Sequence, residues 1–274
     1  MSTKKTDKEL AFLYDLYVAT DWGERFAELF DEHVKLPAKG RALYVASGTG
    51  GHALALVERA GPDVTFICVD ESEERLDLAR AKALAVKATN IEFMHAQLEA
   101  LLFEDEQFNL IVADASMVAP ERLPEMISEI ARVAAPGAVV ALNAVTSSSF
   151  GEFFSVYWEA LSNKGHDEQA AGVESLIAEL PIVSELETLA GREALDGVEA
   201  WTQMEEFVFA SADEFLNAPL VRDFLLVNWL ESIPDEEARA EVLGEIERII
   251  DDERSGADFS LSIKATTLVG RKAK

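Results

Sequence analysis

The chain contains little cysteine and little positive charge. Cys68 is the single cysteine in 274 residues, so no internal disulfide can form, and its place within the apolar run VTFICVD predicts a buried, unreactive strand thiol. Lys and Arg number 24 against 51 Asp and Glu, which gives a net charge of −27. Such a charge repels phosphate backbones and anionic lipid headgroups, so we expect neither nucleic acid nor a membrane surface as a partner.

Long apolar runs and metal-ligand spacings are also missing. No stretch of 18 apolar residues occurs, and MSTKKTDKEL at the N-terminus has no apolar segment after its lysines. The first absence argues against a transmembrane helix and the second against a secretory signal, so we expect a soluble, cytoplasmic protein. No pair of histidines has the spacing of metal ligands and there is no cysteine cluster, so we expect no metal.

Short apolar runs alternate with longer amphipathic runs from residue 40 to about residue 145, which is typical of βαβ units. The runs LIVA and AVVAL are almost wholly apolar, as expected of parallel strands buried on both faces. We predict a doubly wound α/β fold with a mostly parallel, seven-stranded sheet. Within this region the predicted strands are 41–46, 64–69, 91–95, 108–113 and 137–144, and the predicted helices are 51–60, 73–87 and 121–134.

Helical segments flank this region on both sides. Residues 7–33 have apolar positions at helical spacing, interrupted at Asp21, Trp22 and Gly23, so a break there and two N-terminal helices are expected. Residues 151–260 hold 27 acidic and 6 basic residues and are mostly helical, apart from a strand near 201–209. We therefore divide the chain into N-terminal helices (1–38), an α/β core (39–148), an acidic helical cap (149–258) and a final core strand (259–274).

A glycine-rich loop follows the first predicted strand, within LYVASGTGGHALAL at residues 43–56. This arrangement places free backbone N–H groups at the start of a helix, and glycine allows both the tight turn and the close approach of a ligand. Asp70 ends the next apolar run, where an acidic residue can accept hydrogen bonds from both ribose hydroxyls of a nucleotide cofactor. The loop and Asp70 together indicate a cofactor site.

Two classes of cofactor suit this arrangement. Gly48, Gly50 and Ala53 match the dinucleotide fingerprint G-x-G-x-x-G/A, with Asp70 at the expected distance. The other candidate is S-adenosylmethionine, whose tail carries an amine and a carboxylate but no phosphate. A short glycine pattern alone leaves both cofactors open.

Residues 42–145 resemble the class I S-adenosylmethionine-dependent methyltransferases, in particular those that act on small molecules. Four segments carry the resemblance in order: LYVASGTGGHALAL, FICVDESEERLDLAR, IEFMHAQLEALLFEDEQFNLIVAD and RVAAPGAVVAL. They are similar to the family's glycine motif, its acidic ribose-binding segment, its adenine loop with the fourth strand, and its Pro-Gly turn before the fifth strand. The terminal KATTLVGRK also resembles the family's last strand.

The resemblance implies methyl transfer from S-adenosylmethionine to an oxygen, nitrogen or carbon of a small organic molecule, by a monomer or homodimer. Asp114, at the carboxyl end of a strand, becomes the candidate catalytic residue, and a loop cap is its other possible role. The implied cofactor-binding residues are Ala46, Ser47, Gly48, Thr49, Gly50, Asp70, Glu71, Gln97, Leu98, Asp114 and Ala115. The candidate substrate-pocket residues are Tyr14, Trp22, Ser116, Phe154 and Trp158.

The sequence departs from the family pattern at several positions. Tyr44 stands where an acidic residue is usual, Ala46 where glycine is usual, and Gln97 where aspartate is usual. These departures favour an alternative in which the chain is a non-catalytic protein that keeps the fold. A third hypothesis, an NAD(P)-dependent oxidoreductase, has only the glycine pattern in its support. His52 follows the loop directly; it either contacts the ligand or, as we expect, lies on the helix surface.

Overall fold

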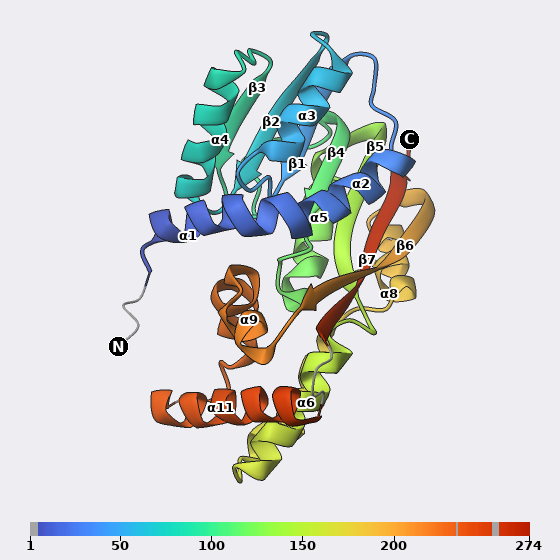
Figure 1. Ribbon diagram of the computed structural model, residues 1–274. Coiled ribbons are helices and arrows are strands. Elements are labelled where there is room, and N and C mark those ends of the chain that lie inside the picture. The colour runs from blue at the N-terminus through green and yellow to red at the C-terminus, as the bar shows by residue number, and fades with distance from the viewer. Residues whose placement is uncertain (1–4, 234, 254–257) are drawn as a thin grey trace. The chain divides into compact units, whose positions relative to one another are not determined.

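The computed structural model describes residues 5–233, 235–253 and 258–274 (Figure 1). Its helices are α1 (Asp7–Leu13), η1 (Tyr14–Trp22), α2 (Gly23–His33), α3 (Gly51–Ala60), α4 (Glu73–Ala85), η2 (Pro120–Arg122), α5 (Leu123–Val133), α6 (Gly151–Asn163), α7 (Asp167–Glu179), α8 (Val183–Arg192), α9 (Ala212–Asn217), η3 (Val221–Leu225), α10 (Leu226–Trp229) and α11 (Glu236–Glu253). Its strands are β1 (Gly40–Val45), β2 (Val64–Asp70), β3 (Ile91–His95), β4 (Phe108–Asp114), β5 (Ala134–Thr146), β6 (Leu195–Phe209) and β7 (Phe259–Lys272).

Seven strands form one sheet in the order β3-β2-β1-β4-β5-β7-β6. The pairs β1/β2, β1/β4, β2/β3 and β4/β5 are parallel. The strand order reverses at β1 and β4, and in open α/β sheets such a reversal leaves a ligand-binding crevice at the carboxyl ends of the strands. The predicted doubly wound, mostly parallel fold is confirmed, with β5 and β6 longer than the apolar runs suggested.

The central strands are buried on both faces, and alternate residues serve opposite sides of the sheet. Leu43 and Val45 pack in a core that includes the apolar faces of α5 and α8. Ala42 and Tyr44 pack in a second core with α3 and the end of α2. Tyr44 therefore projects toward α3, the helix that the glycine loop begins.

The predicted break in the N-terminal helix is wrong, because α1, η1 and α2 follow one another without interruption (Figure 1). Gly23 has helical φ and ψ of −63° and −38°, and its N–H donates to the carbonyl of Val18, five residues earlier. The intervening π-helix makes wider turns and keeps Tyr14, Val18 and Trp22 buried. Burial of Trp22, at 1% exposure, accounts for helix continuing through a sequence that reads as a break.

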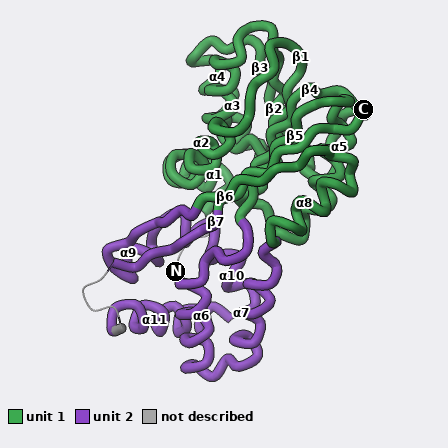
Figure 2. The backbone as a smooth tube through the Cα atoms, turned by 90° about the vertical axis from the view of Figure 1, so that its right-hand side faces the viewer, with its two compact units in different colours: residues 1–145, 182–203, 265–274 green, residues 146–181, 204–264 purple. Residues whose placement is uncertain are grey.

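The described chain separates into two compact units (Figure 2). Unit 1 comprises residues 1–145, 182–203 and 265–274, and unit 2 comprises residues 146–181 and 204–264. Unit 2 has its own aromatic core, in which the Phe153 ring stacks on the rings of Tyr157 and Trp229. The four segments predicted from the sequence were defined by their expected role in the protein, whereas the two units are defined by compactness. The four-segment division therefore stays a prediction. None of the helices in the described residues has the length and apolar character needed to cross a membrane.

Candidate functional site

The glycine loop turns sharply between β1 and α3. Ala46, Gly48 and Gly50 have φ values of 57°, 56° and 75°, in the left-handed region. A Cβ on Gly50 would lie 2.9 Å from the Cβ of Ala79, and a Cβ on Gly48 would lie 2.8 Å from Cε1 of Tyr14. Glycine is therefore needed at both positions for the backbone conformation and for close packing.

Three N–H groups of this loop are used inside the protein. Ser47 donates to the carbonyl of Val69 at 3.0 Å, Gly48 to the Asp70 carboxylate at 2.8 Å, and Gly50 to the carbonyl of Ser47 at 3.0 Å. The loop thus presents fewer free N–H groups than the sequence suggested. Within the described chain, the buried Ser47 hydroxyl has no hydrogen-bond partner.

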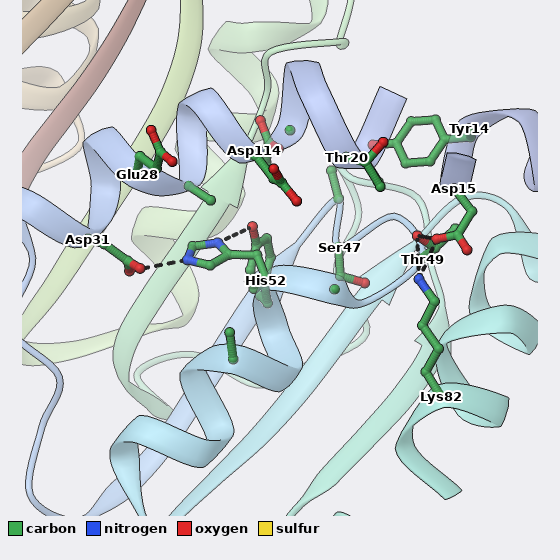
Figure 3. A pocket seen from close by; sticks show the side chains of 18 residues that line it. Tyr14, Asp15, Thr20, Glu28, Asp31, Ser47, Thr49, His52, Lys82 and Asp114 are labelled. Carbon is green, nitrogen blue, oxygen red and sulfur yellow. Dashed lines mark hydrogen bonds and ion pairs between the residues drawn. The ribbon is translucent and has the colours of Figure 1, made fainter. Parts of the chain in front are cut away.

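A cavity of about 310 Å³ lies between the N-terminal helix and the glycine loop (Figure 3). Ala46, Ser47 and Thr49 line it from the loop, and Asp114 lines it from the end of β4. Tyr14 and other residues of η1 and α2 form the opposite wall. The cavity therefore lies at the carboxyl ends of β1 and β4, where the strand order reverses.

Asp114 caps the turn after β4 and also lines the cavity, and its catalytic role stays a prediction. Its Oδ1 accepts a hydrogen bond from the N–H of Ser116 at 3.1 Å, which caps the turn after β4. The carboxylate also lines the cavity, and burial raises its pKa above the ordinary value. Ser116 is buried, and its hydroxyl accepts a hydrogen bond from Trp22 Nε1 at 3.0 Å. Two candidate pocket residues thus contact each other beside Asp114.

Asp70 faces the loop but does not line the cavity. It is 3% exposed, and its carboxylate accepts hydrogen bonds from the N–H groups of Gly48 and Ser72 at 2.8 and 2.9 Å. The Tyr14 ring lies against Gly48, and the Arg75 guanidinium lies 4.1 Å from the centre of that ring. Burial raises the pKa of Tyr14, which keeps its hydroxyl protonated.

An ion pair and a hydrogen bond hold η1 against α4 and the glycine loop. Asp15, next to Tyr14, pairs with Lys82 of α4 and accepts a hydrogen bond from the Thr49 hydroxyl. Thr49 is 1% exposed. These contacts join η1, the glycine loop and α4 at one end of the cavity (Figure 3).

The remaining candidate cofactor residues lie outside the cavity wall. Gln97 is exposed, whereas Leu98 and Ala115 are buried at 3% exposure each. Glu71 is exposed, and its two oxygens accept hydrogen bonds from Arg122 at 2.6 and 3.0 Å. The structure therefore brings Tyr14, Ala46, Ser47, Thr49 and Asp114 together around the cavity. The candidate residues of unit 1 that do not line it are Trp22, Gly48, Gly50, Asp70, Glu71, Gln97, Leu98, Ala115 and Ser116.

Phe154 and Trp158, the other candidate pocket residues, belong to α6 in unit 2. Phe154 is 2% exposed and packs against Phe153 and Trp229, whereas Trp158 is 51% exposed. A role for either residue in a substrate pocket stays a prediction.

Tyr44, His52 and Asp31 are among the cavity residues that were not assigned to the site from the sequence, and they contact one another. The hydroxyl of Tyr44 lies 2.9 Å from His52 Nδ1, and His52 Nε2 lies 3.3 Å from the Asp31 carboxylate. The His52 side chain is 13% exposed, so its expected surface location is wrong. No grouping of three metal-ligating side chains occurs in the described residues.

Comparisons with known proteins identify the fold. Residues 42–137 match the family described as "Methyltransferase domain". The chain is similar to a demethylmenaquinone methyltransferase of Shouchella clausii (31% identity over 117 residues) and to the ubiquinone/menaquinone biosynthesis C-methyltransferase UbiE of Geobacter sulfurreducens (31% over 123 residues). Each alignment covers 43% of this chain, with 50% and 48% of the relative. The chain thus spans about half the length of these curated relatives.

Solved structures share the architecture over most of the chain. The YcgJ protein from Bacillus subtilis has a TM-score of 0.59 at 18% identity, covering 92% of this chain and 99% of that one. The phosphoethanolamine N-methyltransferase 2 of Haemonchus contortus, solved with S-adenosyl-L-methionine, has a TM-score of 0.58 at 15% identity, covering 100% of this chain and 59% of that one. Residues 42–137 thus match a methyltransferase domain, and the chain shares the fold of these solved structures, one of which is a methyltransferase with bound S-adenosyl-L-methionine.

Proposed function

We propose that this chain binds S-adenosylmethionine and transfers its methyl group to an oxygen, nitrogen or carbon of a small organic molecule. The observation that carries the proposal is the cavity at the carboxyl ends of β1 and β4, which the glycine loop borders. Open α/β sheets bind ligands at this position. The same loop and Asp114 fall within the segment that matches the methyltransferase family.

Different residues would hold the two ends of the cofactor: residues that line the cavity would hold the aminoacyl tail, and residues outside it would hold the adenosine. The unpartnered Ser47 hydroxyl, with Ala46 and Thr49 beside it, would hold the aminoacyl tail inside the cavity. Asp70 would hold the ribose, and Gln97 with Leu98 would hold the adenine. Because the Tyr14 ring lies against Gly48 beside Asp70, we expect the Tyr14 side chain to move when the ribose binds.

S-adenosylmethionine supplies a methyl group that is already activated by its positively charged sulfur. The protein therefore needs to align the acceptor and exclude water more than to supply an acid and a base. Asp114 lines the cavity, and in this proposal its carboxylate accepts a hydrogen bond from the molecule that receives the methyl group. The raised pKa of Asp114 also suits a carboxylate that takes up a proton from an O–H or N–H group of the molecule that receives the methyl group.

Thermal unfolding with added ligand tests the binding step. We expect S-adenosylmethionine and S-adenosylhomocysteine to stabilise the protein, by about 2.7 kcal/mol at a concentration one hundred times the dissociation constant. NAD and NADP should give no shift, and Asp70→Ala should reduce the shift with both adenosyl ligands. A folded sample that shows no shift with millimolar adenosyl ligand would contradict the proposal.

The covered Asp70 supports a second candidate function, a non-catalytic protein that keeps the fold. The Asp70 carboxylate is 3% exposed, lies 3.8 Å from the Arg75 guanidinium and accepts hydrogen bonds from Gly48 and Ser72, while the Tyr14 ring lies against Gly48. The two candidates differ in turnover. A methyltransferase should convert radiolabelled S-adenosylmethionine to S-adenosylhomocysteine when small-molecule extracts are added, with a loss of turnover in Asp114→Ala. The alternative predicts no conversion above the buffer control.

A further inference from the structure

The cavity continues beyond the glycine loop into a part that lies between α2 and α3, which we call the α2–α3 pocket (Figure 3). Glu24, Ala27 and Glu28 line this pocket from α2, and Gly51 and Ala55 line it from α3. All of these residues except Ala27 are exposed. A molecule from solvent can therefore enter the pocket without passing through the glycine loop.

The walls of the α2–α3 pocket suit an aliphatic molecule. A Cβ added to Gly51 would meet nothing within 4 Å, so the pocket is open at the start of α3. Ala27 and Ala55 present only methyl groups to it. These two residues and Gly51 offer no flat ring surface on which an aromatic molecule could stack, whereas a hydrocarbon chain packs well against methyl groups.

Three carboxylates of the cavity lack a cationic partner. Of the five that line it, Asp15 forms an ion pair with a lysine of α4, and Asp31 forms one with an arginine of α3. Glu24, Glu28 and Asp114 form no ion pair within the residues that the structure describes. The cavity therefore carries negative charge that the protein itself does not balance.

S-adenosylmethionine would balance only a part of this charge. Its sulfur and its ammonium group are positive and its carboxylate is negative, so it brings a single net positive charge. Two of the three unpaired carboxylates then remain without a counter-charge. A second molecule with two positive charges would balance them, and aliphatic amines are positively charged near neutral pH, as the lysine side chain is.

The Ser47 hydroxyl is a separate indication that this cavity receives a polar ligand. It lines the cavity, is buried, and has no hydrogen-bond partner in the described part of the chain. A buried hydroxyl without a partner costs free energy, which a bound polar molecule recovers. The carboxylates therefore surround a binding cavity and are not simply a solvated acidic surface.

We propose that the methyl acceptor is a short aliphatic diamine, with its reacting nitrogen at Asp114 and its other nitrogen between Glu24 and Glu28. The inference rests on the proposed function, because it names the acceptor of that reaction. Glu24 and Glu28 are four residues apart on α2, so their side chains are neighbours on one face of the helix. Together they bind one ammonium group.

The reacting nitrogen must lose a proton before it can form a bond. It enters as an ammonium group and releases one proton to solvent through the open side of the pocket. Its lone pair then bonds to the methyl carbon while the carbon–sulfur bond breaks, and the sulfur keeps that electron pair. The products are S-adenosylhomocysteine and a protonated N-methyl diamine, which the same carboxylates still hold.

Calorimetric titration with three four-carbon probes tests the recognition. Wild type saturated with S-adenosylhomocysteine is titrated with butane-1,4-diamine, butylamine and butane-1,4-diol. We expect the diamine to bind about fivefold more tightly than butylamine, because it adds an ammonium group between two exposed carboxylates. Butylamine should bind at Asp114, and the uncharged diol should show no detectable binding.

Two double variants with the same change in net charge locate the site. In Glu24→Gln/Glu28→Gln the diamine should bind about fivefold more weakly, as weakly as butylamine does. The matched control is Glu32→Gln/Glu58→Gln, which removes two exposed carboxylates from α2 and α3 that do not line the cavity. The control should keep the preference for the diamine. Asp114→Asn should weaken both amines about tenfold or more, as for loss of a hydrogen bond to a charged group.

Mass spectrometry of the reaction mixture tests the acceptor role. With S-adenosylmethionine and butane-1,4-diamine, wild type should form N-methylbutane-1,4-diamine. Glu24→Gln/Glu28→Gln should raise KM for the diamine about fivefold and leave kcat unchanged, because these carboxylates bind the nitrogen that does not react.

The outcomes separate the inference from the function on which it rests. If the protein binds S-adenosylhomocysteine but binds the three probes equally or not at all, the inference is overturned and the proposed function stands. An equal loss of diamine affinity in Glu32→Gln/Glu58→Gln also overturns the inference, since net charge and not the pocket then attracts the diamine. A diamine that binds without being methylated overturns the acceptor role. Failure of folded wild type to bind S-adenosylhomocysteine overturns the proposed function and the acceptor role together.

Discussion

Gly50 and Gly61 stand at the two ends of α3, and both have positive φ, at 75° and 78°. Their surroundings differ. A Cβ at Gly50 would approach the Cβ of Ala79 to 2.9 Å and the Phe93 ring to 3.1 Å, whereas a Cβ at Gly61 would meet nothing within 4 Å. Both positions therefore require a positive φ, although ψ is 9° at Gly50 and −176° at Gly61, and only Gly50 also has a packing requirement.

This difference gives a paired prediction. Gly61→Ala should cost about 1–3 kcal/mol of unfolding free energy, because its φ of 78° with ψ of −176° strains the backbone of any residue other than glycine, while the added methyl group meets no other atom. Gly50→Ala should cost about 1–3 kcal/mol more, because the added methyl group forces Ala79 and the glycine loop apart. Urea unfolding of both variants measures the difference. Equal losses in the two variants would contradict a packing role for Gly50.

Single residues were predictable from the sequence where spacing along the chain sets their position. Asp114 and the glycine loop are examples, because strand ends in a parallel sheet meet at one edge. The contact between Tyr44 and His52 spans eight residues, and the one between His52 and Asp31 spans 21. No local periodicity joins these three side chains, since α2 reaches α3 only through packing against the sheet. The packing of Tyr14 against Gly48, next to Asp70 in the structure, is likewise a tertiary contact without a sequence signal.

At the scale of elements, the N-terminal helix is held over the glycine loop by a few identifiable contacts. Asp15 binds Lys82 and Thr49, the Tyr14 ring lies on Gly48, and the Arg75 guanidinium lies over that ring. The cation–π contact and the buried ring stabilise the covered arrangement. Binding of a ribose at Asp70 then requires these contacts to open first.

Removal of the ring should make opening easier. In Tyr14→Ala we expect the association rate of S-adenosylhomocysteine to rise on the order of tenfold, because loss of a buried aromatic side chain removes more than 1.4 kcal/mol from the cost of opening. Stopped-flow mixing measures this rate. Tyr17→Ala is the matched control, since Tyr17 lies on the same helix but is 47% exposed. An unchanged or slower rate in Tyr14→Ala would show that Tyr14 does not obstruct the site.

Elements with strong periodicity matched their predicted positions closely, whereas the N-terminal helix did not. The strands predicted at 64–69 and 91–95 correspond to β2 and β3 within one residue at each end. In the N-terminal helix, Asp21, Trp22 and Gly23 have low helix preference, and burial of Trp22 overrides it. The π-helical turns of η1 have no sequence signature, so tertiary packing alone determines them.

At the scale of the whole molecule, the net charge of −27 is the dominant electrostatic feature. Like charges repel one another in the folded state, and dissolved salt screens that repulsion. The ion pairs of the described residues are mostly on the surface and contribute little individually. Salt should therefore remove more repulsion between like charges than attraction within ion pairs, and the folded state should become more stable.

We expect the melting temperature at neutral pH to rise when sodium chloride is increased from about 0.1 M to about 1 M, as the screening length falls from about 10 to about 3 Å. A gain of about 1 kcal/mol corresponds to about 2–4 °C for a chain of this size. Calorimetry measures the shift. Near pH 4.4, the isoelectric point, the same salt should have little effect. A melting temperature that falls with salt at neutral pH would indicate that ion pairs outweigh repulsion.

The position of β7 between β5 and β6 has a consequence for biosynthesis. As the ribosome releases the chain, β1 to β5 and then β6 emerge while Phe259–Lys272 is still in the exit tunnel or not yet made. The outer edge of β5 must remain unpaired during that interval, and β6 has no neighbour in the sheet. An open strand edge can pair with other nascent chains, so the release of Phe259–Lys272 from the ribosome should end a period in which the exposed edge of β5 favours aggregation.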